Sequence, residues 1–169
     1  MSAEPEIFQL HDSERLTVVT DTPELLEVAA EWGPVEHRPP AHLHPSQDER
    51  FVVAEGELTA EIAGERRVLG AGDVLEIPRG TPHRMWNSGT GPARASWQTR
   101  PALRTAQFWR AMDAARQTRP TRHGGLLTPV AVAPLLRKYR PEFQLALPAP
   151  LERTALAVLG LAARVRGYR

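Results

Sequence analysis

The stretch PPAHLHPSQDERF, residues 39–51, combines two histidines one residue apart with an acid that follows a short polar turn. Residues i and i+2 of a strand point to the same face, so His42 and His44 project together if this segment is extended. Two interpretations stand at this point. The segment is either part of a metal site or a polar loop that contains two histidines.

The turn PSQD at 45–48 resets the alternation of the strand, which decides where the acid points. In the strand that follows, Glu49, Phe51 and Val53 share one face and Asp48 lies on the other. Because Phe51 and Val53 are apolar, their face is the buried one. We therefore predict that Glu49, rather than Asp48, faces the interior.

A second stretch, GAGDVLEIPRGTPHRMWNSG at residues 70–89, supplies a further histidine. It predicts a strand that ends at Pro78, a turn at Gly80, and a new strand beginning at His83. An apolar interior would not tolerate three unpaired imidazoles and a charged acid, whereas a divalent cation would satisfy all of them. The sequence therefore favours a metal site formed by His42, His44, Glu49 and His83.

Composition excludes several classes of function. The chain of 169 residues has no cysteine, which rules out disulfides, thiolate metal ligands and thiol catalysis, and its net charge is only +1. The N-terminus lacks the basic start and apolar run of a secretory signal, and no apolar run is long enough to span a membrane. We expect a cytoplasmic protein that binds neither nucleic acid nor a membrane.

The chain has two halves of different character. Short apolar or alternating runs, punctuated by Gly, Pro and Asp, predict strands at 15–22, 24–32, 50–64 and 67–78. After Pro101, helical spacing of apolar residues predicts helices over 101–118, 126–140 and 150–167. We expect a barrel domain over residues 1–100 and a helical extension over 101–169 that packs on the barrel.

The two stretches together resemble the cupin superfamily. Its first motif, G-x5-H-x-H-x3–4-E-x6-G, is matched by the two histidines, Glu49 and Gly56, although Glu36 stands at the leading glycine. Its second motif, G-x5-P-x-G-x2-H-x3-N, is matched without departure from Gly72 to Asn87. The helical half lies outside both motifs and resembles the tail of a bacterial single-domain cupin group of unassigned activity.

The resemblance implies an all-β fold, an antiparallel β-barrel of the double-stranded β-helix or jelly-roll type, here with a C-terminal α-helical extension. It also implies that His42, His44, Glu49 and His83 bind one divalent metal inside the barrel. Imidazole and carboxylate ligands suit Fe, Mn, Ni, Cu, Co or Zn and do not choose among them. Four protein ligands leave positions open for substrate, which is typical of a reactive site.

Three functions fit such a centre. The first is a metal-dependent oxidoreductase, similar to a dioxygenase, that acts on a small organic substrate inside the barrel. The second is a non-redox isomerase or cyclase, and the third is a small-molecule binding or sensing protein without turnover. We note no helix-turn-helix or basic stripe, which disfavours a DNA-binding sensor. No catalytic residue is predicted beyond the ligands.

Four residues near the ligands are predicted to line the substrate pocket: Phe51, Val53, Met85 and Gln47. For the first three the alternative is core packing. Gln47 could reach the mouth of the barrel, and the alternative is a solvated turn residue. Asn87 is predicted to have a structural role. The last predicted helix is expected to pack on the barrel, and the alternatives are that it closes the barrel mouth or joins a homodimer.

Overall fold

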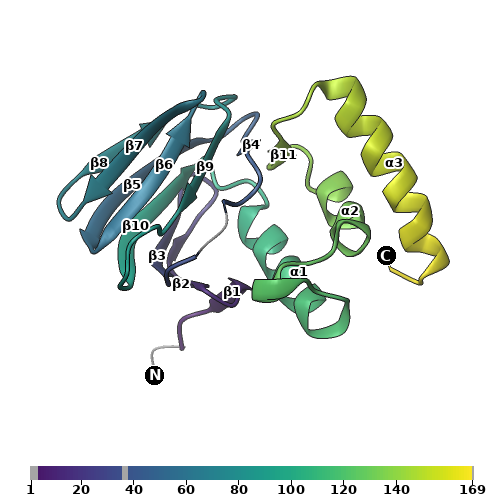
Figure 1. The fold of residues 1–169 in the computed structure, drawn as a ribbon, viewed down its shortest axis with the longest axis horizontal. Coiled ribbons are helices and arrows are strands. Elements are labelled where there is room, and N and C mark those ends of the chain that lie inside the picture. The colour runs from purple at the N-terminus through teal and green to yellow at the C-terminus, as the bar shows by residue number, and fades with distance from the viewer. Residues whose placement is uncertain (1–3, 36–37, 169) are drawn as a thin grey trace.

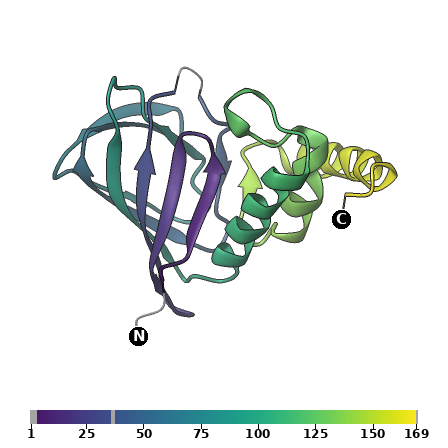
Figure 2. The same cartoon turned by 90° about the horizontal axis from the view of Figure 1, so that it is seen from below.

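The structure, a computed structural model, describes residues 4–35 and 38–168. Glu36, where the first motif lacks its glycine, lies outside the described residues. The strands form two antiparallel sheets that together make the barrel, and the helices lie to one side of it (Figures 1 and 2). This arrangement confirms the predicted all-β barrel with a helical extension.

Each sheet takes strands from distant parts of the chain. The first sheet has the order β1 (Ile7–His11), β2 (Glu14–Asp21), β3 (Leu26–Trp32), β10 (Ala93–Arg100), β5 (Asp48–Glu55) and β8 (Val74–Ile77). The second has the order β11 (Gln144–Leu145), β4 (His42–Leu43), β9 (His83–Trp86), β6 (Glu57–Ile62) and β7 (Glu65–Gly70). Strand β11 comes from the predicted helical extension.

The barrel core follows the alternation that the sequence predicts. On β5, Glu49, Phe51 and Val53 are buried while their neighbours are partly exposed. The residues of β3 alternate in the same way, with Leu26 and Val28 fully buried. Burial of one large apolar side chain stabilises a fold by about 1.5–3 kcal/mol, so a shift of register by one residue would be costly.

The extension contains α1 (Thr105–Thr118), a short 3-10 turn η1 (His123–Gly125), α2 (Pro129–Lys138) and α3 (Ala149–Val165). Thr128 caps α2 by accepting a hydrogen bond from Ala131 N, and Pro129 occupies the first helical turn. Helices α1 and α2 fall within their predicted ranges, and α3 begins one residue before its predicted range of 150–167. The first begins only at Thr105 because a turn, in which Thr105 N donates to Ala102 O, precedes it.

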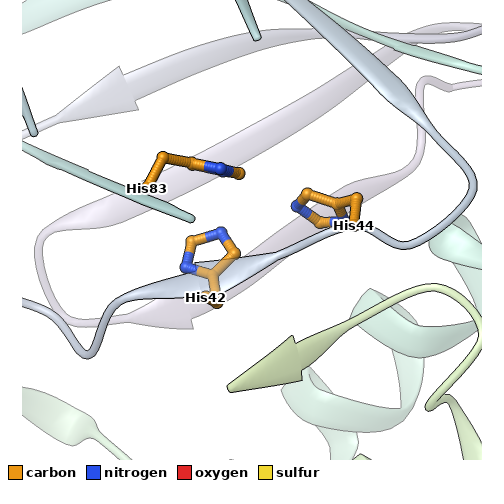
Figure 3. A group of neighbouring side chains, drawn as sticks. All are labelled: His42, His44 and His83. Atoms are coloured by element: carbon orange, nitrogen blue, oxygen red, sulfur yellow. The ribbon is translucent and has the colours of Figure 1, made fainter. Parts of the chain in front are cut away.

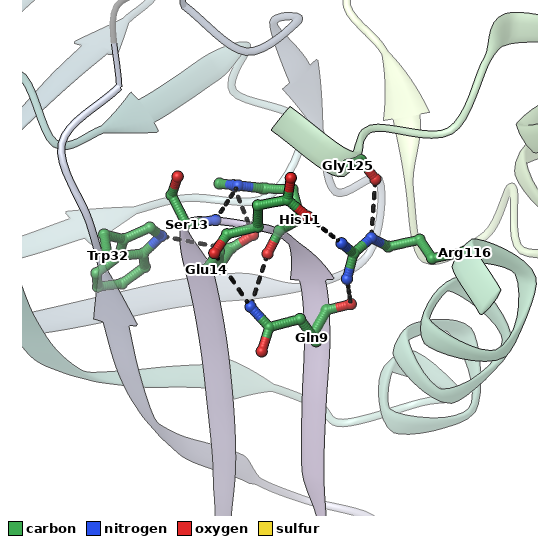
Figure 4. Close-up of polar contacts among 8 residues, drawn as sticks. Gln9, His11, Ser13, Glu14, Trp32, Arg116 and Gly125 are labelled. Carbon is green, nitrogen blue, oxygen red and sulfur yellow. Dashed lines mark hydrogen bonds and ion pairs between the residues drawn. The ribbon is translucent and has the colours of Figure 1, made fainter. Parts of the chain in front are cut away.

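A polar network joins α1 to the first strands of the barrel (Figure 4). Arg116 of α1 donates to the backbone oxygen of Gln9 at 2.7 Å and to that of Gly125 at 2.8 Å, and it forms an ion pair with Asp12. Nearby, Trp32 donates to Glu14 at 2.8 Å. The first part of the extension is therefore fixed to β1 through directed contacts.

Helix α3 packs against α2 and lies away from the barrel (Figures 1 and 2). Helix α1 contacts β1, and the main contacts of α3 are with α2. Four apolar side chains of α3 are exposed: Leu151, Val158, Leu161 and Val165. The homodimer stays a prediction. Within the described residues, no helix has both the length and the apolar character needed to cross a membrane.

Asn87 closes the loop between β9 and β10. Its amide nitrogen donates to the backbone oxygens of Trp32 and Gly91 at 2.9 and 2.8 Å, and its oxygen accepts from Gly89 N at 2.9 Å. The side chain is fully buried. This network gives Asn87 the structural role that the sequence predicts.

We expect Asn87→Ala to destabilise the protein by about 2–4 kcal/mol, because it removes three buried hydrogen bonds and leaves their partners unpaired. Denaturant unfolding would measure the loss. The matched control is Thr90→Ala in the same loop, at an exposed side chain, with an expected change within about 0.5 kcal/mol. Equal stability of the Asn87→Ala variant and the wild type would contradict this role.

Candidate metal centre

Two adjacent strands and the loop after β4 bring three histidines together. His42 on β4 lies directly opposite His83 on β9 in the antiparallel register, and His44 follows His42 by two residues. Their side chains point toward one another from these elements (Figure 3). One ring nitrogen from each lies within 4.8 Å of the others, as a shared metal ion requires.

Glu49 adds the carboxylate that the sequence predicts. One carboxylate oxygen, Oε1, lies 3.3 Å from His44 Nε2, and the other, Oε2, lies 2.9 Å from His83 Nε2. Glu49, His44 and His83 are all buried, while His42 is partly exposed. The structure therefore brings the three histidines together and places Glu49 against two of them, and the ligand role of the four residues stays a prediction.

Backbone carbonyls set the orientation of the imidazole rings. His44 Nδ1 lies 2.6 Å from the oxygen of Glu142, and His83 Nδ1 lies 2.9 Å from that of Thr81. A carbonyl oxygen can only accept, so Nδ1 of each ring carries the proton. In the neutral ring, Nε2 then presents its lone pair, which is the form that binds a metal.

Two of the predicted metal-ligand residues have buried polar atoms that lack a regular hydrogen bond. Among the described residues, His44 Nε2 and Glu49 Oε2 are fully buried and have only the ion-pair contacts with Glu49 Oε1 and His83 Nε2 in place of a regular hydrogen bond. Buried polar atoms are nearly always hydrogen-bonded, and each exception needs an explanation. A cation bound between these atoms would supply the missing interaction, so the residues present fit a metal ion.

The charges of the cluster are unevenly distributed. Burial opposes the charge of Glu49, but the imidazoles of His44, His83 and His42 outweigh it and lower the pKa of Glu49 to about 2. Burial lowers the pKa of His42 to about 3, and the nearby histidines add to this effect. Burial also disfavours the charged form of His83, but the Glu49 carboxylate outweighs it and raises the pKa of His83. Without a metal, Glu49 is thus anionic, and His83 keeps a proton more readily than His42.

This donor set matches the preferences of first-row transition metals. Three imidazoles and one carboxylate suit Fe, Mn, Ni, Cu, Co or Zn, while a Ca²⁺ or Mg²⁺ site would consist mostly of oxygen donors. Three neutral rings and one anion leave a divalent ion with a net charge near +1. Such a centre attracts small anionic groups such as an enolate, a catecholate or a carboxylate.

Comparison with known families agrees with this geometry. The model of the cupin domain matches residues 30–98, a range that includes all four donors and runs from β3 into β10. The barrel is a cupin domain. The solved structures that resemble it include KdgF from Halomonas sp., with a TM-score of 0.54 and 21% identity over 60% of this chain and 92% of that one. An RmlC-like cupin from Shewanella frigidimarina gives a TM-score of 0.54 at 20% identity, over 60% of this chain and 88% of that one.

Curated relatives match this chain at higher identity but over short stretches. Oxidoreductase iacF of Pestalotiopsis fici is 51% identical over 49 residues, which are 28% of this chain and 24% of that protein. Quercetin 2,3-dioxygenase of Bacillus subtilis is 37% identical over 62 residues, which are 37% of this chain and 18% of that protein. The tetracenomycin polyketide synthase protein TcmJ of Streptomyces glaucescens is 37% identical over 60 residues, 36% and 40% of the two chains. The matched stretch thus spans less than half the length of each of these relatives.

Trp97 on β10 contacts the carboxylate of Glu49, one of the four predicted metal ligands. Its indole Nε1 donates to Glu49 Oε1 at 2.9 Å. The ring stacks on Phe51, with centroids 5.2 Å apart, and lies 4.9 Å from the ring of Trp109. These neighbours fix the indole, so its N–H holds the carboxylate in one orientation toward the histidines.

We expect Trp97→Phe to weaken divalent-metal binding by about 10-fold, because it keeps an aromatic ring but removes the hydrogen bond that orients Glu49. Isothermal titration calorimetry with Zn²⁺ would measure the affinity. Trp32→Phe is a matched control, since Trp32 lies in the same sheet and donates to Glu14 instead. Equal losses in the two variants would contradict a specific role for Trp97.

The residues predicted to line the pocket have different surroundings. Phe51 and Val53 belong to the hydrophobic core and are 2% and 1% exposed. Met85 lies opposite the buried Ala60 and packs against the same core while remaining partly exposed. Core packing, the stated alternative, thus describes Phe51 and Val53, and contact with a substrate stays a prediction for all three residues.

The side chain of Gln47 is buried, so it is not the solvated turn residue that was the alternative from the sequence. It is 1% exposed, and its amide nitrogen donates to the backbone oxygens of Pro101 and Ala102 and to Thr105 Oγ1, at 2.8–2.9 Å. These acceptors lie where the chain leaves β10 and enters α1. The side chain thus joins the ligand loop to the start of the extension, because a buried amide needs partners that solvent cannot supply.

Sequence reasoning missed three residues at the centre. Trp97 carries a usable signal, since Ala93, Ala95 and Trp97 alternate along a strand and share the face of Glu49. Glu142 and Phe143 carry no such signal, because they follow the ligand motif by about a hundred residues and lie outside any strand pattern. Their part in the centre is visible only in the folded chain.

Proposed function

We propose that this cupin binds one divalent transition-metal ion through His42, His44, Glu49 and His83. We further propose that it is a metal-dependent oxidoreductase, similar to a dioxygenase, which acts on a small organic substrate inside the barrel. The observation that carries the proposal is the convergence of four buried or partly buried donors, two of which have buried atoms without a regular hydrogen bond. A bound redox-active ion would supply the electron transfer for reaction with oxygen.

The oxidative part of the proposal rests on relatives. The proteins named oxidoreductase iacF and quercetin 2,3-dioxygenase are 51% and 37% identical to this chain over 49 and 62 residues. Their names supply the support for oxidative chemistry. The donor set itself suits both redox and Lewis-acid ions, so the choice between them needs experiment.

The residues of the chain have distinct tasks in this proposal. The carboxylate of Glu49 supplies the one negative charge of the centre, and Trp97 holds it in place. His44 and His83 keep Nδ1 on backbone carbonyls, which leaves Nε2 free for the ion. The core residues around them exclude water, which strengthens electrostatic interactions with a bound anionic substrate.

Oxygen consumption would test the proposed reaction. Protein loaded anaerobically with Fe²⁺ is mixed with air-saturated buffer and with quercetin or simple catechols as probes, and an oxygen electrode follows uptake. We expect uptake that requires both Fe²⁺ and one of the probes, and that is lost in His42→Ala. A stoichiometric iron centre without uptake for any probe would contradict the oxidative proposal.

Further outcomes of the same experiment would identify the alternatives. Conversion of a probe by Zn²⁺-loaded protein without oxygen uptake would point to a non-redox isomerase or cyclase. Saturable binding without conversion would point to a binding or sensing protein. Both outcomes keep the metal centre and replace the reaction assigned to it. The cytoplasmic location and the homodimer are separate predictions that this experiment leaves unchanged.

A further inference from the structure

Residues 142–145 of the C-terminal extension lie directly against the histidines of the barrel. The backbone oxygen of Glu142 accepts the hydrogen bond from His44 Nδ1 at 2.6 Å, across 98 residues of sequence. Strand β11 then pairs with β4, and its register places Leu145 opposite His42. The extension therefore supplies part of the surroundings of two predicted metal ligands.

The ring of Phe143 covers the same two histidines. It stacks on His42 with centroids 4.6 Å apart and an interplanar angle of 18°, and it meets His44 edge-on at 5.8 Å. On its other side, Phe143 lies 5.5 Å from Phe108 of α1. The helical extension thus holds the aromatic ring that limits the movement of the two imidazoles.

Two buried carboxylates fix this segment within the extension. Glu142 is 3% exposed and accepts two hydrogen bonds from Arg104, from Nε at 2.8 Å and from Nη2 at 3.0 Å. Glu152 is 2% exposed, forms an ion pair with Arg140 at 2.8 Å, and accepts from the backbone nitrogen of Leu145 at 3.2 Å. The bidentate pair between Arg104 and Glu142 fixes geometry as well as charge.

The three rings differ in what orients them. His83 Nδ1 bonds to Thr81 within its own loop at 2.9 Å, so the barrel alone sets that ring. His42 Nδ1 lies 3.4 Å from Pro40 O, a long and weak contact. His42 and His44 therefore take their firm orientation from residues of the extension, through Phe143 and Glu142.

We propose that residues 142–145 are a positioning element of the metal centre, held in place by the ion pair between Arg104 and Glu142. This inference rests on the proposed metal site and deepens it. It predicts that the barrel binds a divalent ion at full strength only when the extension is correctly packed. A change at Arg104, which does not contact the histidines, then alters the geometry of the centre through Glu142.

Two variants test the proposal in the full-length protein. Arg104→Gln removes the bidentate pair to Glu142, and Phe143→Leu keeps an apolar side chain but removes the ring stacked on His42. The matched control is Arg110→Gln, which removes a bidentate pair between α1 and Glu6, far from the histidines in sequence and in sheet order. Circular dichroism checks that each variant is folded.

The readouts are Zn²⁺ affinity, from competition with a chromogenic chelator, and the visible spectrum of the Co²⁺-loaded protein. We expect a loss of affinity of about 10- to 100-fold in Arg104→Gln and in Phe143→Leu, with a changed Co²⁺ spectrum, because partners of ligating histidines have effects of this size. The control should match the wild type within about threefold. A general loss of stability would lower affinity without changing the spectrum of the bound fraction.

The outcomes separate this proposal from the one on which it rests. If the wild type binds Zn²⁺ and Co²⁺ and both variants bind them equally well with the same spectrum, the positioning role is overturned and the metal site stands. If both variants lose affinity only as much as the control, the role is also overturned. If the wild type binds neither ion, the metal site itself is refuted, and the positioning role with it.

Discussion

Replacement of His83 by alanine is expected to lower the affinity of the barrel for divalent transition metals by at least about 100-fold. The variant loses a predicted ligand outright. Loss of a residue that only hydrogen-bonds to a metal ligand already lowers metal affinity by about 10- to 100-fold. His83 also lies 2.9 Å from Glu49 and opposite His42, so its removal disrupts the centre at two points. Metal competition assays on the purified variant would measure the change.

Two companion variants make this result interpretable. His83→Gln keeps an N–H donor near Glu49, so it separates loss of the ligand from the cost of leaving a buried carboxylate unpaired. His11→Ala removes a histidine that also lies beside an acid, Glu14 at 3.2 Å, but outside the centre. We expect weak metal binding in both His83 variants and wild-type binding in His11→Ala. Full affinity in either His83 variant would contradict the assignment.

Gly56→Ala is expected to destabilise the protein by about 3–5 kcal/mol, from two separate causes. Gly56 joins β5 to β6 with φ of 74°, a conformation that costs about 1–3 kcal/mol for other residues. A Cβ atom there would also collide with the backbone oxygen of Pro92 and lie 2.8 Å from the Cα of Ala93. Overpacking against atoms that cannot move aside costs about 1–3 kcal/mol more.

Gly64→Ala is the matched control for the collision. Gly64 also has a positive φ, 90°, but no atom lies within 4 Å of where its Cβ would be. Only the cost of the backbone conformation remains, so we expect a loss of about 1–2 kcal/mol. Urea unfolding of both variants would compare them, and equal losses would show that the contact with Pro92 and Ala93 is unimportant.

The proximity of the three histidines and the burial of Glu49 could be predicted from the sequence because they depend on local rules. Strand alternation and one turn place Glu49 on the buried face beside Phe51, and the structure has this arrangement. The same rules gave the long strands and the three helices, whose apolar periodicity is strong. They missed β1 and β11, whose five and two residues show too little of a strand pattern.

The surroundings of the ligands could not be predicted, since they depend on pairings between distant segments. Nothing in the residues around Glu142 indicates that its backbone oxygen meets His44, because backbone groups carry no sequence signal. Gln47 has the polarity of a surface turn residue, and only the path of the chain after β10 explains its burial. The packing of α3 on α2 likewise follows from tertiary contacts that a single amphipathic pattern does not specify.

The metal content of the purified protein tests the central claim most directly. Elemental mass spectrometry would compare the wild type with the double variant His42→Ala/His83→Ala, each prepared anaerobically and reconstituted with Fe²⁺, Mn²⁺ or Zn²⁺. The four converging donors predict about one equivalent of a first-row metal in the wild type and almost none in the double variant. A wild type that holds no metal after reconstitution, or a double variant that keeps a full equivalent, would contradict the account.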